Sequence, residues 1–154
     1  MCKLTKQVQK DATHLGELIT ETIKENKYLK ESSFYSSALV ESTDDIVYVT
    51  DIETNKILFV NAETKRLFGD VVGKICYSVF QNTGEPCSFC TNDKITKQIG
   101  KPHKWVFYNQ KVDKLYYIVD IAKEVNGRLL RFERAINLNG EAEKIVEMFN
   151  KHKL

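Results

Sequence analysis

A single turn in the second half of the chain constrains the fold more than any other feature. Asn126-Gly127 separates two β-rich segments, residues 115–125 and 129–136. This dipeptide suits the type I′ turn of a tight hairpin, because that turn needs positive φ at both central positions. In both segments apolar side chains recur at the two-residue period of a strand. The second half of the chain is therefore expected to form an antiparallel sheet.

Three further segments have the composition of strands, since each is rich in β-branched and aromatic residues. They are residues 45–51, 57–60 and 104–108. A turn-forming run at 53–56 predicts a hairpin from the first two. After this hairpin, Asn61 can cap a short helix, and Gly69 suits the left-handed position that ends one. The expected order is two strands, then short helices and loops, then three strands.

The apolar alternation of the last three strands assigns an inner face to the sheet. Its expected residues are Trp105, Phe107, Leu115, Tyr117, Val119, Ile121, Leu130 and Phe132. The charged Arg131 and Glu133 are then expected to point outward. The outer face is nevertheless expected to carry apolar residues, namely Val106, Tyr108, Tyr116, Ile118 and Ala122. An apolar outer face needs cover, which a helix or a second subunit can supply.

A polar segment that is predicted to be helical precedes the strands. Val8, Leu15 and Leu29 lie at multiples of seven residues, with Thr22 between them, which is the spacing of a weak helical seam. Residues 1–35 are therefore expected to form an amphipathic helix. Its apolar side could pack on its own domain or pair with a second copy of the chain, and the spacing leaves both alternatives open.

The helical segments set the expected division of the chain. A shorter helix is predicted at residues 36–41, and apolar residues at helical spacing after Gly140 predict a last one. We expect an N-terminal helix for dimerisation or signalling at 1–35, a central domain at 36–139 and a C-terminal helix at 140–154.

Composition and charge exclude several classes of protein. A net charge of +2 comes from 23 basic and 21 acidic residues that are interspersed, so the clustered charge of a nucleic-acid binder is missing. No stretch approaches the roughly 18 apolar residues of a membrane span, and the N-terminus lacks a signal-like apolar run. We therefore expect a cytoplasmic protein, in which cysteines are normally reduced. No catalytic motif is visible, so no enzymatic activity is expected.

Three cysteines in the middle of the chain are candidate reactive or metal-binding groups. They are Cys76, Cys87 and Cys90, and the last two form a Cys-x-x-Cys pair. They could pack as small apolar groups. They could also form a disulfide or an oxidisable pair, because Cys87 and Cys90 lie near a predicted helix start, which would lower a thiol pKa. Cys76 could instead bridge Cys87 if the loop brings the two residues close enough. A structural zinc site usually has four ligands, and His103 is the nearest candidate for the fourth.

The order of the elements resembles the PAS sensor domain. The likeness covers about residues 36–139 and is carried by short motifs. They are Ile46-Val47-Tyr48-Val49-Thr50-Asp51, Ile57-Leu58-Phe59-Val60-Asn61-Ala62, Leu67-Phe68-Gly69 with Val72-Gly73-Lys74, and the closing strand 126–133. The stretches 73–77 and 86–90 also resemble a cysteine-bearing PAS subgroup of microbial signalling proteins. One departure is Asn137-Leu138-Asn139, where the family often has Asp-Ile-Thr.

The resemblance implies an α+β fold, in which short helices cover one face of a five-stranded antiparallel sheet and further helices flank it at both ends. The helices would enclose a ligand pocket lined by Phe80, Ile95, Trp105, Phe107, Tyr117 and Phe132. The implied function is a sensory and dimerisation module in signal transduction that responds to a small ligand or to redox state. The alternative is an interaction scaffold with a filled core. A homodimer through the N-terminal helix and the outer sheet face is expected, and no cofactor is indicated.

Overall fold

The computed structural model describes residues 2–139 and residue 151. The chain forms two compact units, residues 1–42 and 43–154. The C-terminal helix expected at 140–154 lies outside the described residues, apart from residue 151.

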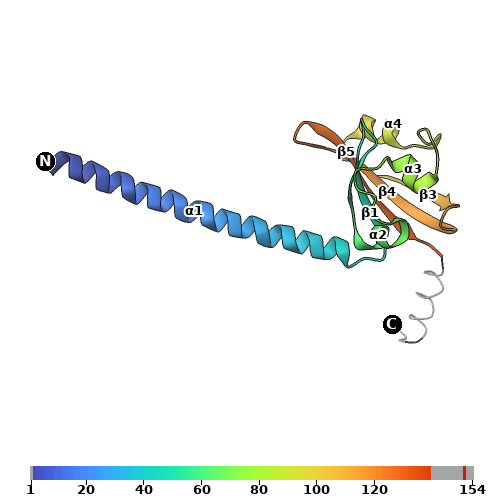
Figure 1. Ribbon diagram of the computed structural model, residues 1–154, viewed down its shortest axis with the longest axis horizontal. Helices are drawn as coiled ribbons and strands as arrows, with labels where there is room; N and C mark the ends of the chain where they lie inside the picture. Colours follow the sequence, from blue (N-terminus) through green and yellow to red (C-terminus); the bar gives the residue numbers. More distant parts are fainter. Residues whose placement is uncertain (1, 140–150, 152–154) are drawn as a thin grey trace. The chain divides into compact units, whose positions relative to one another are not determined.

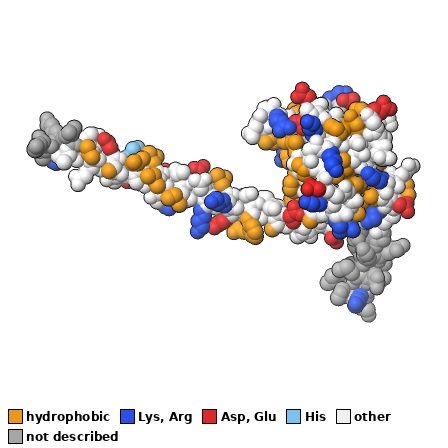
Figure 2. All heavy atoms as spheres, in the orientation of Figure 1, with side chains coloured by type: hydrophobic (Ala, Val, Ile, Leu, Met, Phe, Trp, Pro, Cys, Tyr) orange, Lys and Arg blue, Asp and Glu red, His pale blue; other side chains and the backbone are white. Residues whose placement is uncertain are grey.

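The first unit is one continuous helix, α1, which spans Cys2–Glu41 (Figure 1). The prediction of a separate helix at 36–41 was wrong, because no glycine or proline interrupts the preceding turns. Serine side chains there bond to their own helix, as Ser36 does to the Ser32 carbonyl oxygen at 3.0 Å. Every side chain described between residues 5 and 39 is exposed, and Figure 2 shows hydrophobic side chains along this helix. No described helix has the length and apolar character needed to cross a membrane.

The second unit is built on a five-stranded antiparallel sheet in the order β2-β1-β5-β4-β3. Its strands are β1 (Ile46–Asp51), β2 (Ile57–Val60), β3 (His103–Asn109), β4 (Lys114–Val125) and β5 (Arg128–Asn137). Between β2 and β3 lie the short helices α2 (Ala62–Phe68), α3 (Cys76–Gln81), α4 (Asn92–Ile95) and the 3-10 turn η1 (Thr96–Gln98). Figure 1 shows these elements beside the sheet. The predicted α+β fold is confirmed for the described residues.

Local sequence signals fix the turns of this unit. Asn126 and Gly127 have φ values of 52° and 71°, as the predicted type I′ hairpin between β4 and β5 requires. Asn61 caps α2 by accepting a hydrogen bond from the Thr64 backbone nitrogen at 3.1 Å. At the end of β5, the Asn139 side chain accepts a hydrogen bond from the Leu115 backbone nitrogen at 2.6 Å. Asparagine thus still bonds the backbone where the family often has Asp-Ile-Thr.

The assignment of faces was right for β3 and wrong for β4 and β5. Register pairs Trp105 with Ile118 and Phe107 with Tyr116, and paired residues in an antiparallel sheet point to the same side. The inner face of β4 and β5 therefore carries Tyr116, Ile118, Asp120, Ala122, Arg131, Glu133 and Ala135. The outer face carries Val47, Val49, Val106, Tyr117, Val119, Ile121, Phe132 and Ile136.

The reason for this error is physical. Both faces of β4 and β5 are apolar, so alternation alone does not distinguish them. The assignment then depended on the charges of Arg131 and Glu133, which are usually exposed. Here they are only 8% and 6% exposed, because they pair with each other and with Asp120 on the neighbouring strand.

Candidate functional site

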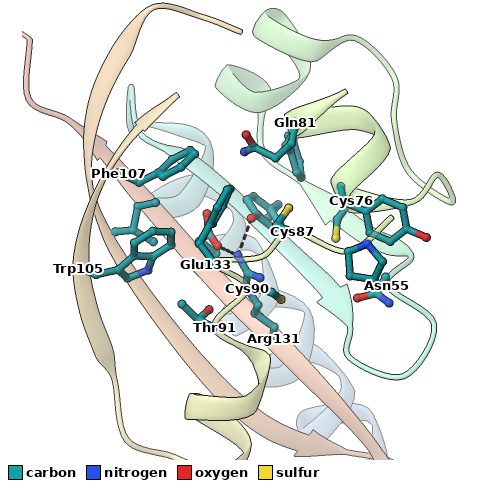
Figure 3. A pocket seen from close by; sticks show the side chains of 16 residues that line it. Asn55, Cys76, Gln81, Cys87, Cys90, Thr91, Trp105, Phe107, Arg131 and Glu133 are labelled. Carbon is teal, nitrogen blue, oxygen red and sulfur yellow. Dashed lines mark hydrogen bonds and ion pairs between the residues drawn. The ribbon is translucent and has the colours of Figure 1, made fainter. Parts of the chain in front are cut away.

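A cavity of about 50 Å³ lies between the inner face of the sheet, α3 and the loop that follows α3 (Figure 3). Its wall is contributed by β1, β3, β4 and β5 as well as by the cysteine-containing segment. The lining residues are Tyr48, Asn55, Cys76, Tyr77, Phe80, Gln81, Pro86, Cys87, Phe89, Cys90, Thr91, Trp105, Phe107, Ile118, Arg131 and Glu133. The three cysteines therefore belong to the same site as the aromatic residues of the core.

Of the six residues predicted to line a pocket, three do so. Phe80, Trp105 and Phe107 lie in the wall of the cavity. Ile95 on α4 is buried, with 1% of its surface exposed, but it packs outside the lining. Tyr117 and Phe132 lie on the opposite face of the sheet, so their inclusion was wrong for the same reason as the face assignment of β4 and β5.

One wall of the cavity is aromatic. The ring of Phe89 lies 4.6 Å from that of Phe107, and Trp105 lies 5.4 Å from Phe107, measured between centroids. On the other side, the rings of Tyr48 and Phe80 are 4.5 Å apart. These contacts within typical stacking range fix the shape of an apolar wall.

Another part of the cavity wall is a buried ionic cluster centred on Arg131, on the same face of the sheet. Its Nε donates to Asp120 Oδ1 at 3.0 Å, and its Nη2 donates to the Tyr48 hydroxyl at 2.9 Å. Nη2 also donates to Glu133 Oε2, as the dashed lines of Figure 3 show. Burial alone would lower the pKa of Arg131, but Tyr48 and Asp120 raise it above the ordinary value, so Arg131 stays charged.

Asp120 and Tyr48 belong to the same cluster. The Asp120 side chain is fully buried, and its Oδ2 accepts hydrogen bonds from Thr91 Oγ1 and Trp105 Nε1, both at 2.8 Å. Burial raises the pKa of Tyr48 well above its ordinary value, so its hydroxyl remains protonated. Buried charges persist only when paired and hydrogen-bonded, and the cluster meets that condition for Asp120.

The structure brings the three cysteines to one cavity without a disulfide between them. Cys76, Cys87 and Cys90 are half-buried, and none forms a disulfide. The expectation that a helix start lowers the pKa of Cys87 was wrong, because burial raises the pKa of both Cys76 and Cys87. The helix that follows, α4, has only four residues and begins at Asn92, so it offers little dipole to offset the burial.

The metal hypothesis receives no geometric support from the described residues. Among them, no group of three or more His, Cys, Asp and Glu side chains is placed to hold a metal ion. His103 lies on β3 opposite Asp120 and does not line the cavity with the cysteines. Its Nε2 is buried without a hydrogen-bond partner in the described part of the chain. The redox and metal roles of these residues stay predictions.

The polar half of the site was not predicted from the sequence. Asp120, Arg131, Glu133 and Thr91 were not singled out as site residues, although they form its most buried polar cluster. A usable signal was present, because Asp120 interrupts an otherwise apolar run and Arg131 and Glu133 share one side of the next strand. Charges in a strand that is apolar on both sides point to a buried ion pair or a site.

Comparison with known proteins identifies the architecture. No family model matches the sequence, and no curated protein is similar enough to count as a relative. Among solved structures, the PAS domain of an HTR-like protein from Haloarcula marismortui is 17% identical with a TM-score of 0.53, covering 75% of this chain and 98% of that one.

Two other solved structures give the same result. The PAS domain of nitrogen regulation protein NR(II) from Vibrio parahaemolyticus is 11% identical with a TM-score of 0.54, covering 67% of this chain and 97% of that one. A PAS domain from a two-component sensor histidine kinase is 10% identical with a TM-score of 0.52, covering 70% and 97%. Identity this low establishes shape alone, and it agrees with the strand order and the covered inner face. Residues 43–139 of this chain have the PAS fold.

Proposed function

We propose that the chain is a cytoplasmic sensory and dimerisation module of a signal-transduction protein, without catalysis of its own. The observation that carries the proposal is the cavity, which joins an aromatic wall, a buried ionic cluster and three thiols under the short helices. Concave sites with apolar walls and a few convergent polar groups are the usual ligand sites of proteins. The similar solved structures include domains of a nitrogen regulation protein and a sensor histidine kinase, which agrees with this role.

The ionic cluster offers a route from the cavity into the sheet. Arg131 of β5 bonds to Tyr48 of β1 and to Asp120 of β4, and Asp120 bonds to Trp105 of β3. A ligand that engages Arg131 or Glu133 therefore acts on contacts made by four strands. For this to be a switch, the ligand must bind two arrangements of these contacts with different affinity.

Ligand binding is better supported than redox sensing. A thiol reacts as its thiolate, and burial raises the pKa of Cys76 and Cys87, which reduces the thiolate fraction at neutral pH. We therefore assign the cysteines primarily to the wall of the ligand site. Equal binding of the same ligands after oxidation of the thiols would agree with this assignment.

We base the proposed dimerisation on the exposed apolar side chains of α1. A helix with no buried face gains nothing from tertiary packing, which is the main source of helix stability in proteins. Val8, Leu15 and Ile19 are 62%, 58% and 51% exposed and lie near the predicted seam of this helix. A second copy of the chain that pairs along this seam would cover them. The apolar outer face of the sheet offers a second surface for the same partner.

Two measurements test this function. Screening a metabolite library for thermal stabilisation of the full chain tests sensing, and the proposal expects at least one ligand whose effect is lost in Phe107→Ala. Sedimentation equilibrium tests pairing, where Leu15→Asp is expected to weaken the dimer. Thr13→Asp adds the same charge to α1 outside the seam and is expected to leave the dimer intact. A monomeric wild-type chain, or no stabilising ligand, would contradict the respective half of the proposal.

A scaffold domain without a ligand is the second candidate function. The observation that favours it is the size of the cavity, about 50 Å³, which is small beside the roughly 300–1,000 Å³ of typical ligand pockets. A dimer that forms normally while no compound alters its stability would favour the scaffold over the sensor.

A further inference from the structure

We propose that the cavity selects a small, uncharged ligand of the primary amide or urea class and rejects carboxylates. This inference rests on the proposed sensory function and deepens it by naming the ligand chemistry. It follows from which polar atoms of the ionic cluster remain open to the cavity, from the charge of that cluster and from the size of the space.

Glu133 and Arg131 each keep one polar atom open to the cavity. Both oxygens of Asp120 are engaged, since Oδ1 accepts from Arg131 and Oδ2 accepts from Thr91 and Trp105. Glu133 uses Oε2 to accept from Arg131 Nη2. Among the described residues, no hydrogen bond engages Glu133 Oε1 or Arg131 Nη1, although both side chains line the cavity.

These two atoms belong to deeply buried side chains. The side chain of Arg131 is 10% exposed and that of Glu133 is 6% exposed. Neither atom is among the fully buried side-chain atoms without a partner, so both can reach a partner from solvent or ligand. Because Nη2 and Oε2 of the same two side chains already meet, Nη1 and Oε1 lie within the span of one small molecule. A primary amide fits both, since its carbonyl oxygen accepts from Nη1 and its N–H donates to Oε1.

The charge of the cluster excludes anions. Two carboxylates, Asp120 and Glu133, share one guanidinium, so the formal charge of the buried group is −1. Of these three side chains Arg131 and Glu133 line the cavity, Asp120 lies behind Arg131, and no further Lys, Arg, Asp or Glu lines it. A carboxylate ligand would add a second uncompensated charge in a poorly solvated site. A cation would relieve the excess charge but would have no acceptor for Arg131 Nη1.

The size of the cavity limits the ligand. Its volume of about 50 Å³ compares with about 10–15 Å³ for one water molecule, so a molecule of about four non-hydrogen atoms fits. Phe89 and Phe107 form an apolar wall against which a flat group can lie, and Figure 3 shows Phe107 in it. Acetamide and urea have this size and shape, and the amide end of a longer ligand would enter in the same way.

Three isosteric probes of different charge test the ligand class. Acetamide, acetate and acetamidinium are titrated into the full chain at constant ionic strength. Trp105 is the single tryptophan of the sequence and bonds to Asp120 in the cluster, so its indole N–H resonance reports binding. Acetamide is expected to give a saturable shift, with acetate at least tenfold weaker and acetamidinium weaker than acetamide. Acetate or acetamidinium binding as tightly as acetamide, or no saturable shift with any probe, would overturn the proposal.

A charge variant sharpens the same test. Glu133→Gln removes the excess negative charge, so the preference for acetamide over acetate is expected to fall by at least threefold. Glu124→Gln makes the same change at an exposed position of β4 and is expected to keep the wild-type preference. If a folded Glu133→Gln protein keeps the wild-type preference for acetamide over acetate, the proposal is overturned. If the variant does not fold, the titrations of the wild-type chain with the three probes decide whether the proposed ligand class is correct.

The sensory function and the ligand class can fail separately. If acetamide binds in the expected order but no ligand alters dimerisation or the sheet contacts, the sensory function fails and the ligand class stands. If a carboxylate ligand binds the cavity and changes the dimer, the ligand class fails and the sensory function stands.

Discussion

Two neighbouring rows of side chains cross the inner face of the sheet and differ in character. The apolar row consists of Ile46, Ala135, Ile118 and Trp105, and the polar row consists of Tyr48, Glu133, Asp120 and His103. They are two residues apart on every strand. The apolar row is closed by packing, whereas Tyr48, Glu133 and Asp120 of the polar row are held by directed bonds to Arg131 and Thr91. Tyr48 and Glu133 also line the cavity.

The difference teaches where stability and specificity come from in this domain. Burying the apolar row removes hydrocarbon from water and stabilises the fold directly. Burying the polar row costs desolvation that its ion pairs roughly offset, so apolar replacements of the whole cluster could be as stable. The polar row is thus poorly explained by stability, and its open atoms give it a use in binding.

The largest expected effect comes from breaking the polar row at its centre. Arg131→Met leaves Asp120 and Glu133 buried without a cation, and we expect a loss of about 3–5 kcal/mol in the free energy of unfolding. Urea denaturation measures it.

The control for this prediction is another arginine on the same strand. Arg134 bonds to Asp45, but its side chain is 58% exposed, so Arg134→Met should cost only about 0–1 kcal/mol. Similar losses in the two variants would show that the buried cluster is no more important than a surface ion pair.

The apolar row is tested by truncating one of its members. Ile46 is 5% exposed, and Ile46→Ala should lower the free energy of unfolding by about 2–4 kcal/mol through lost burial and a residual cavity. Val106 on β3 is 55% exposed, so Val106→Ala should change stability by about 0.5 kcal/mol or less. A loss at Val106 equal to that at Ile46 would mean that the outer face is as buried in solution as the inner one.

A smaller effect is expected from one hydroxyl of the polar cluster. Thr91→Val keeps the shape of the side chain but removes the donor to Asp120, and should cost about 1–3 kcal/mol. Thr83 is exposed and its hydroxyl donates to the backbone carbonyls of Tyr77 and Glu85, so Thr83→Val should stay within about 0.5 kcal/mol. Both are measured by thermal or urea unfolding, and a neutral Thr91→Val would show that Asp120 does not depend on this bond.

The smallest effect concerns an ion pair between the last residue of β1 and the first residue of β5. The pKa of Asp51 is lowered to about 2. The largest cause is a hydrogen bond from the backbone N–H of Thr54, and the second is a hydrogen bond from the side chain of Arg128. Because the folded pKa is below the unfolded value of about 3.9, this stabilisation is present at neutral pH and is lost as the pH falls towards 2. It should be about 1–2 kcal/mol, since the half-exposed Arg128 is screened by salt.

Comparing Asp51→Asn with the wild type across pH measures this contribution. The variant should be less stable at pH 7, and the difference should shrink to about half by pH 3. A difference that stays constant with pH would show that the Asp51 charge contributes nothing.

The sequence predicted the elements of the sheet well, because local signals determine them. The Asn126-Gly127 turn, the Asn61 cap and the β-branched runs all act over a few residues, and the strands lie within two residues of their expected bounds. The aromatic wall was also found in part, since Phe80, Trp105 and Phe107 line the cavity.

The polar half of the site could not be predicted in the same way. Whether Arg131 and Glu133 point inward depends on the register of β5 with β4 and on Asp120, eleven residues before Arg131. Hydrophobic alternation carries no information about such pairing, so it selected the wrong face of both strands. The extent of α1 was missed for a different reason, because serines that bond back to their own helix do not end it.

The bonds that Arg131 makes to three other side chains limit how this site can evolve. A substitution of Arg131 alone leaves Asp120 and Glu133 buried without a cation, so an intermediate that loses Arg131 first would be poorly folded. Divergent copies of this domain should therefore exchange the basic residue and its acids together, or else retain all of them.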